Sequence, residues 1–253
     1  MRTVALRRTA VAATAASLAL LVTACGGDGK GEDKGKDAPK ASASASAAPD
    51  AKALSVAELE KLIVEQADLK GHQVQKAKPT DVVKSSDVTT DKADCKPIAD
   101  AMSFIATGNP AASVQRKAIE VPKTEGPSAS PEEALGALAA PVSAITLGSY
   151  DGSGAQDAFA SLKKAGAECA GGFTLTGGGE ETKIGKVAPE TVTAGEEAVA
   201  FTVTTDMDGK PFISKVVAFR KGNTLASFSV ISLAGEVKEL PKAVIDAQAA
   251  KLG

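Results

Sequence analysis

The sequence predicts an α+β domain of two layers, in which an antiparallel, meander-rich sheet carries helices packed on one face and one disulfide. Three observations lead to this prediction. Residues 196–233 hold three apolar runs of period two, separated by short hairpin signals. Helical spacings of apolar residues occur near both ends of the domain, at 54–71 and 240–252. Two cysteines, Cys95 and Cys169, lie between them.

The chain begins with the pattern of an export signal. Residues 1–8 carry three arginines and no acid, and a stretch of about 14 apolar or small residues follows at 9–22. This stretch is shorter than the roughly 20 residues that a permanent membrane-spanning helix needs. We therefore expect residues 1–24 to be a signal peptide. The Arg7-Arg8 pair leaves the general and the twin-arginine export routes both open.

The leader ends in Val22-Thr23-Ala24-Cys25, which resembles the bacterial lipobox. This resemblance implies that Cys25 becomes the first mature residue and carries diacylglycerol on its sulfur. Palmitate-type acyl chains, at ~0.8 kcal/mol per buried methylene, would then hold the protein at the outer face of the cytoplasmic membrane. A plain secretory signal is the alternative.

Residues 25–52 predict a disordered tether. They consist of glycine, balanced Lys and Asp/Glu charges and an Ala/Ser/Pro stretch, and the first large apolar residue after them is Leu54. Such a composition buries too little surface to offset the entropy of ordering. A flexible chain of this length spans ~30 Å, which makes it a spacer between the membrane and a single domain at 53–253.

Charge and aromatic content argue against nucleic-acid binding. The formal net charge is −2, and it becomes −5 when the leader with its three arginines and no acid is removed. A mildly acidic chain is a poor candidate for nucleic acid, which binds basic patches, and with no Trp, one Tyr and seven Phe the chain lacks aromatic stacking platforms.

Cys95 and Cys169 are an even pair once Cys25 carries lipid, and the exported context favours a disulfide between them. The closed loop of about 75 residues would contribute on the order of 4 kcal/mol. Metal binding is not expected, because His72 is the one histidine, lies far from both cysteines in sequence, and no Cys-x-x-Cys is present.

The first half of the domain predicts two helices and three strands. Ser55 and Glu58 form a capping box for a helix that Gly71 ends, and a short strand follows at 72–77. Asp94 is the expected cap of a second helix, with Ile98, Met102 and Ile105 on its buried side. Strands are expected at 113–121 and 143–151, separated by a low-complexity insertion with a helical turn from Pro131.

The second half predicts a third helix at 152–172, which buries Phe159 and Leu162 and places Cys169 near its end. A brief strand at 173–176 and a loose turn at 177–179 come next. The meander follows, with hairpins at Asp208-Gly209 and at 221–223, and a closing helix buries Val244, Ile245 and Leu252.

The order of these segments resembles the extracellular, sensor-like domain of PknH-type serine/threonine kinases and related actinobacterial lipoproteins. The resemblance covers roughly residues 54–252 and rests on DLKGHQV, ADCKPIADAM, SYD followed by AFASLKKAGAEC, and GEEAVAFTV leading into VAFRKGNTLASFSV. It implies a mixed sheet with helices, a central cleft and two disulfides, whereas this chain has the cysteines for one. Lipoproteins of similar size that carry lipids in an apolar cavity are a variant.

Motifs for catalysis are incomplete. Ser161 to Lys164 match S-x-x-K, but the S-D-N and K-T-G partners are missing. Asp206-Met207-Asp208-Gly209 lacks the closing glutamate of a calcium loop and is interpreted as a hairpin turn. The acid pairs at 132–133, 180–181 and 196–197 are expected to be solvated, His72 to lie in a surface loop, and Tyr150 to be half-buried.

We therefore expect a non-enzymatic module without catalytic residues, metal or cofactor. Its expected partners are the membrane, through the N-terminal lipid, and a small molecule, wall fragment or envelope protein, with no ligand-binding residue identified. The alternative is an envelope hydrolase that uses carboxylates or Ser161.

Overall fold

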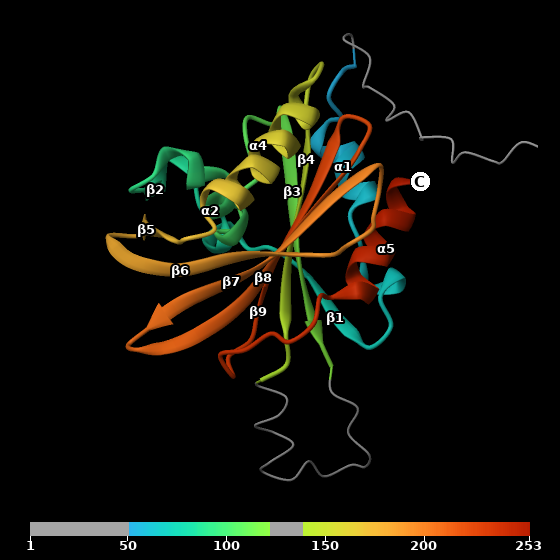
Figure 1. Ribbon diagram of the computed structural model, residues 1–253. Coiled ribbons are helices and arrows are strands. Elements are labelled where there is room, and N and C mark those ends of the chain that lie inside the picture. The colour runs from blue at the N-terminus through green and yellow to red at the C-terminus, as the bar shows by residue number, and fades with distance from the viewer. Residues whose placement is uncertain (1–50, 122–138) are drawn as a thin grey trace, which may run out of the picture. The chain divides into compact units, whose positions relative to one another are not determined.

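The computed structural model describes residues 51–121 and 139–253, which form a nine-stranded antiparallel sheet with helices (Figure 1). The strand order is β1-β3-β4-β9-β8-β7-β6-β5-β2. The strands are β1 His72–Lys76, β2 Val88–Thr90, β3 Ala112–Glu120, β4 Val142–Ser149, β5 Phe173–Gly177, β6 Glu180–Glu190, β7 Glu197–Met207, β8 Lys210–Lys221 and β9 Thr224–Ile231. The expected antiparallel α+β class is confirmed.

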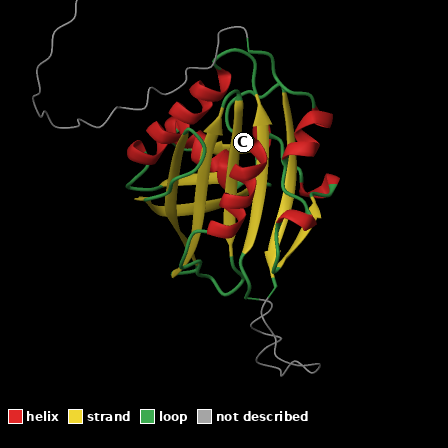
Figure 2. Ribbon diagram, turned by 90° about the vertical axis from the view of Figure 1, so that its right-hand side faces the viewer, coloured by secondary structure: helices red, strands yellow, loops and turns green. Residues whose placement is uncertain are grey.

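The helices cover both faces of the sheet, not one. In Figure 1, α2 and α4 lie to the left of the strands and α1 and α5 to the right, and Figure 2 looks onto the α5 face. The α-helices are α1 Val56–Leu62, α2 Lys96–Met102, α4 Gly154–Glu168 and α5 Lys242–Leu252. Short 3-10 turns are η1 Gln66–Asp68, η2 Pro79–Asp81, η3 Ser85–Asp87 and η4 Ala93–Cys95.

Strand β8 explains why one helical layer is insufficient. Its Val216 and Ala218 belong to the core under α2 and α4, and its Val217 and Phe219 belong to the core under α1 and α5. Neighbouring residues of a strand point to opposite faces, so an uninterrupted apolar run needs cover on both sides.

Helix α1 begins as predicted and ends earlier. Ser55 and Glu58 form the capping box, but the helix stops at Leu62 and the backbone turns extended at Ile63. The buried amide of Gln248 in α5 fixes this end: it accepts from the Val64 N–H at 3.0 Å and donates to the Leu62 carbonyl at 2.8 Å. Gly71 does take a left-handed φ of +74°, but in the turn before β1.

Helix α2 is not capped by Asp94. The 3-10 turn η4 runs directly into it, and Cys95 occupies the cap position without a side-chain bond. Asp94 instead pairs with Lys164 of α4 at 3.2 Å. The helix therefore continues from the preceding 3-10 turn and has no side-chain cap of the kind predicted for Asp94.

The meander β7–β8–β9 is confirmed, including both of its hairpins. Asp208 and Gly209 have φ values of +54° and +79°, and Gly222 has +57°. The Asp206 carboxylate accepts from the Gly209 N–H at 2.8 Å, so this motif is a hairpin turn. Residues 177–179, predicted as a loose turn, are a third tight connection: Gly178 and Gly179 join β5 to β6. The insertion around Pro131 lies outside the described residues.

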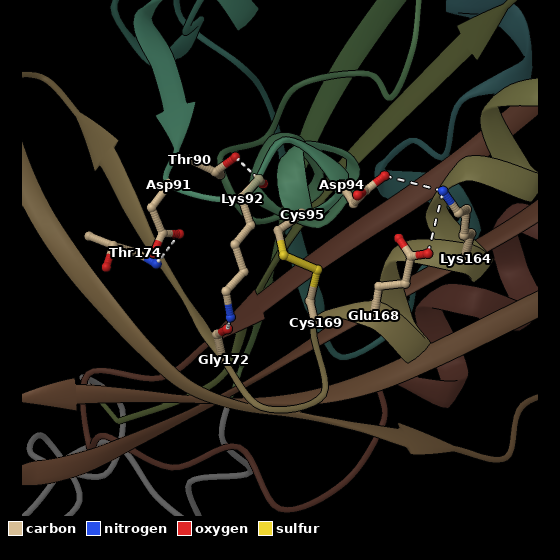
Figure 3. The surroundings of a disulfide bond; sticks show 10 residues. All are labelled: Thr90, Asp91, Lys92, Asp94, Cys95, Lys164, Glu168, Cys169, Gly172 and Thr174. Carbon is tan, nitrogen blue, oxygen red and sulfur yellow. Dashed lines mark hydrogen bonds and ion pairs between the residues drawn. A yellow bond between two sulfur atoms is a disulfide. The ribbon is translucent and has the colours of Figure 1, made fainter.

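The disulfide between Cys95 and Cys169 joins the start of α2 to the end of α4, with a Cα–Cα distance of 5.8 Å (Figure 3). Polar contacts hold both sides of it. Lys92 Nζ donates to the Gly172 carbonyl at 2.6 Å, and Lys164 contacts Asp94 and Glu168. The bridge is buried in the core that α2 and α4 share.

Candidate functional site

Strand β3 is covered along only part of its outer side. β1 pairs with it from Glu120 to Arg116 and then ends at Lys76, although β3 extends back to Ala112. A groove of about 440 Å³ lies along the uncovered part. Its walls come from α1, the end of β1, the segment before β2, the loop after α2 and the first half of β3. We call it the β3-edge groove.

The floor of the groove presents unpaired backbone groups. The Ala77 N–H donates to the Gln115 carbonyl at 3.4 Å, which shows that odd-numbered residues of β3 face this side. Two positions away, Ser113 is exposed, and no partner for its N–H or C=O exists among the described residues on this side. The Gln115 N–H is also without a partner within that part of the chain.

A buried ion pair lies at one end of the groove. The Arg116 side chain is 4% exposed and contacts Glu60 Oε2 of α1 at 2.6 Å, and Lys76 Nζ reaches the same oxygen at 2.9 Å. Hydrogen bonds from Arg116 and then Lys76 lower the pKa of Glu60 to about 2. The guanidinium stands at a core-facing position between Val114 and Ala118, so it depends on this carboxylate for compensation.

The opposite wall contains a second polar cluster. Ser85 lines the groove, donates to the Asp100 carboxylate at 3.1 Å and accepts from Lys96 Nζ at 2.5 Å. Lys96 also contacts Asp100 directly. Burial raises the pKa of Asp100, against the opposing influence of the Lys96 ammonium.

The loop after α2 is held in a strained shape beside the groove. Phe104 has a φ of +66°, which a bulky residue adopts only when its surroundings impose it. Its carbonyl accepts from Gln115 Nε2 and from Thr146 Oγ1, so β3 and β4 fix the loop. Tyr150 OH donates to the Thr107 carbonyl at 2.5 Å. Tyr150 is fully buried, not half-buried as predicted, and burial raises its pKa.

Exposed apolar side chains gather at the groove. Val56 is 52% exposed, Val82 54% and Val83 40%, and all three line it. They are three of the seven large hydrophobic side chains that are exposed in residues 51–121 and 139–253. The groove therefore combines apolar walls, a charged end and an open strand edge.

Ser161 and Lys164 are not arranged as a catalytic pair. Ser161 Oγ donates to the Ala158 carbonyl of its own helix at 2.8 Å. Lys164 points to Asp94 at 3.2 Å and Glu168 at 3.4 Å. Cys25 lies outside the described residues, as does the acid pair at 132–133.

The acid pair at 196–197 is not solvated charge. Glu196 and Glu197 contact the fully buried Arg220 at 2.8 and 2.7 Å, and Arg220 also donates to the Gly222 carbonyl. Glu180 and Glu181 are exposed at the start of β6. His72 is the first residue of β1, half-buried in a separate groove of about 530 Å³ that also includes Glu120 and residues 236–243.

No motif in the sequence marks the residues of the β3-edge groove. One signal was available in SVQRKAIEV. Every second residue of this strand faces inward, and Arg116 occupies the inward position between Val114 and Ala118. A cation at an inward position needs a buried partner, but the partner is 56 residues away. The described residues contain no cluster of three metal-ligating side chains, and no helix within them is long and apolar enough to span a membrane.

No protein-family model and no curated protein matches this sequence. The fold is similar to the crystal structure of the extracellular domain of PknH from Mycobacterium tuberculosis, with a TM-score of 0.51 and 10% identity over 79% of this chain and 97% of that chain. An uncharacterized protein from Mycobacterium smegmatis, an Rv0999 ortholog, matches with a TM-score of 0.34 and 12% identity over 83% of this chain and 97% of that chain. The predicted resemblance is thus confirmed for the fold: the chain shares the fold of the PknH extracellular domain.

Proposed function

We propose that this chain is a non-catalytic, sensor-like binding module of the cell envelope that takes its ligand or partner in the β3-edge groove. The observation that carries the proposal is the groove itself, where open backbone groups, exposed valines and a buried ion pair meet. Exposed apolar side chains that gather in one concave place are typical of binding sites.

The proposal includes a lipid anchor at Cys25 on the outer face of the cytoplasmic membrane. The leader pattern and the tether of residues 25–52 support it. The bond between Cys95 and Cys169 supports it as well, because it leaves Cys25 as the third cysteine and fits an oxidising compartment.

A non-catalytic role is supported by how the polar groups of the groove are used. Ser85 contacts a lysine, as a Ser–Lys nucleophile would. However, the Ser85 hydroxyl donates to the Asp100 carboxylate, and Lys96 contacts the same carboxylate, so the three side chains form a closed polar cluster. Arg116 is likewise occupied by Glu60. These contacts favour a binding surface over the hydrolase alternative.

The lipid-carrier variant needs a deep apolar cavity. The apolar side chains pack together within each of the two cores, and a largely apolar groove between α5 and residues 191–193 is about 270 Å³. The charged end of the β3-edge groove, with Glu60, Lys76 and Arg116, fits a polar or peptide ligand better than an acyl chain.

The test compares the full chain, extracted from membranes in detergent, with a Val82→Asp/Val83→Asp variant. Both valines are exposed, so the variant is expected to fold. We expect a co-purifying species by native mass spectrometry, or a rise in melting temperature with wall fragments, lipid vesicles or peptides, that the variant loses. An extracted protein with no bound species and no thermal response to any of these would overturn the proposal.

A further inference from the structure

We propose that the occupant of the β3-edge groove is an extended peptide segment of a partner protein, which pairs with β3 and continues the line of β1. The inference rests on the proposed function, because it takes the groove to be the binding site. It specifies the class of ligand: a peptide recognised mainly through its backbone.

The backbone groups on the floor fit such a segment. In an antiparallel pair, one residue exchanges both its N–H and its C=O with the residue opposite. The N–H and C=O of Ser113 point to the open side, and the Gln115 N–H follows on the same side. A peptide residue opposite Ser113 can make two hydrogen bonds there, while the position opposite Gln115 is held by Ala77 of this chain.

The outer edges of β1 and β2, the two strands at the ends of the sheet, are protected. On the outer side of β1, the Gln66 amide donates to the His72 carbonyl at 2.8 Å and accepts from the Val74 N–H at 2.9 Å. At the far edge, β2 has three residues, and the Val88 N–H bonds to the Ser85 carbonyl. Side-chain blocking and short length are both devices that prevent strand addition.

The walls fit alternating side chains. Val56 lies on the side of α1, and Val82 and Val83 lie on the opposite side of the strand edge. Successive side chains of an added strand point to opposite faces, so apolar residues can reach both walls. At the end of the groove, Lys76 and Arg116 face Glu60, and Glu65 lies 3.9 Å from the same guanidinium, so the charges there balance.

The walls also select against a second copy of this chain. The open edge lies between α1 on one side and the loops before β2 and after α2 on the other. The matching edge of another folded copy would be recessed between the same walls. A free, extended segment can enter where two recessed edges cannot meet.

The test uses a phage-displayed random heptapeptide library, selected on the full chain in detergent. Ser113→Pro removes one of the open N–H groups, and proline is tolerated on an edge strand when its nitrogen faces outward. The matched control is Thr90→Pro in β2, because the Asp91 N–H pairs with β5 and the neighbouring Thr90 N–H therefore faces away from the sheet.

We expect enriched peptides with apolar residues at alternate positions. Their affinity should fall at least tenfold on Ser113→Pro and on N-methylation of alternate peptide nitrogens, and stay unchanged on Thr90→Pro. If Ser113→Pro lowers the melting temperature strongly, the Val83→Asp variant and the N-methylated peptides decide instead.

The inference is overturned if no peptide is enriched, or if enriched peptides bind the Ser113→Pro and Val83→Asp proteins as well as the wild type. If peptides fail while wall fragments or lipids bind in a manner that Val82→Asp/Val83→Asp abolishes, the peptide inference falls and the proposed function remains. If nothing binds, both fall.

Discussion

Arg116 shows how one residue ties the site to the fold. It is buried in β3, and its charge is compensated from α1 by Glu60, which Lys76 also contacts. Breaking a buried pair by removing one partner is costly because it leaves an uncompensated charge behind. Glu60 therefore contributes to the stability of the domain as well as to the shape of the groove.

Glu60→Gln should lower the free energy of unfolding at pH 7 by about 1–2 kcal/mol, after allowance for the partial exposure of the carboxylate. The folded-state pKa of about 2 lies below the ordinary value of 4.5. The carboxylate thus stabilises the fold above about pH 4.5, and this stabilisation disappears as the pH falls toward 2.

Urea unfolding of wild type and Glu60→Gln between pH 7 and pH 2 measures this. Glu65→Gln is the control, because Glu65 lies 3.9 Å from the same guanidinium and its side chain is 58% exposed. A stability difference between wild type and Glu60→Gln that is the same at every pH would contradict the assignment.

At the scale of residues, the features that could be predicted are those that depend on neighbouring residues or on composition. The cysteine pair, the capping box of Ser55 and the hairpin glycines are examples. The pairs Glu60–Arg116 and Glu197–Arg220 join segments 56 and 23 residues apart. No spacing rule connects such positions, so the candidate site emerged only from the structure.

At the scale of elements, α4 approaches the sheet unusually closely at Gly166. A Cβ atom there would lie 2.1 Å from the ring of Phe201 in β7. The helix therefore carries a residue of poor helix propensity because the packing requires one without a side chain.

Gly166→Ala should destabilise the domain by about 2 kcal/mol, although alanine normally stabilises a helix by about 1 kcal/mol relative to glycine. Gly171→Ala is the matched control, since a Cβ at Gly171 meets no atom within 4 Å, and it should change stability by less than about 0.5 kcal/mol. Thermal unfolding of both variants provides the comparison. Equal effects at the two glycines would show that the close contact with Phe201 does not matter.

The strand that the sequence did not predict, β6, has a physical reason for its weak signal. Its buried residues are Ile184 and Val187, three positions apart, because the pairing register with β7 shifts between Ile184 and Lys186. A bulge of this kind breaks the alternation on which strand prediction depends. β2, with three residues, is too short for any periodic pattern.

At the scale of the whole molecule, the antiparallel α+β class was predictable because the meander and terminal helices carry local signals. The presence of helices on both faces was not predictable, because it depends on which strands lie in the middle of the sheet and are buried on both sides. The anchor at Cys25 remains a prediction of the sequence.

Cys25→Ser tests that anchor, because a serine hydroxyl is too weak a nucleophile to form the thioether. We expect the variant to lose the acyl mass and to leave the detergent-rich phase in a phase-partition assay. Intact-mass spectrometry of membrane and soluble fractions measures both. A Cys95→Ser/Cys169→Ser variant should keep its lipid, and a serine variant at position 25 that stays processed and membrane-held would exclude the lipoprotein assignment.

The strand order also constrains when folding can happen. The edge strands β1 and β2 belong to the first half of the chain, whereas β4, near the middle, needs β9 as its neighbour. Strands cannot pair with partners that the ribosome has not yet made, and distant pairing is slow. The two halves of the sheet, β1-β3-β4 and β8-β7-β6-β5-β2, can therefore join only after residues 224–231 have been made, because β9 alone lies between them.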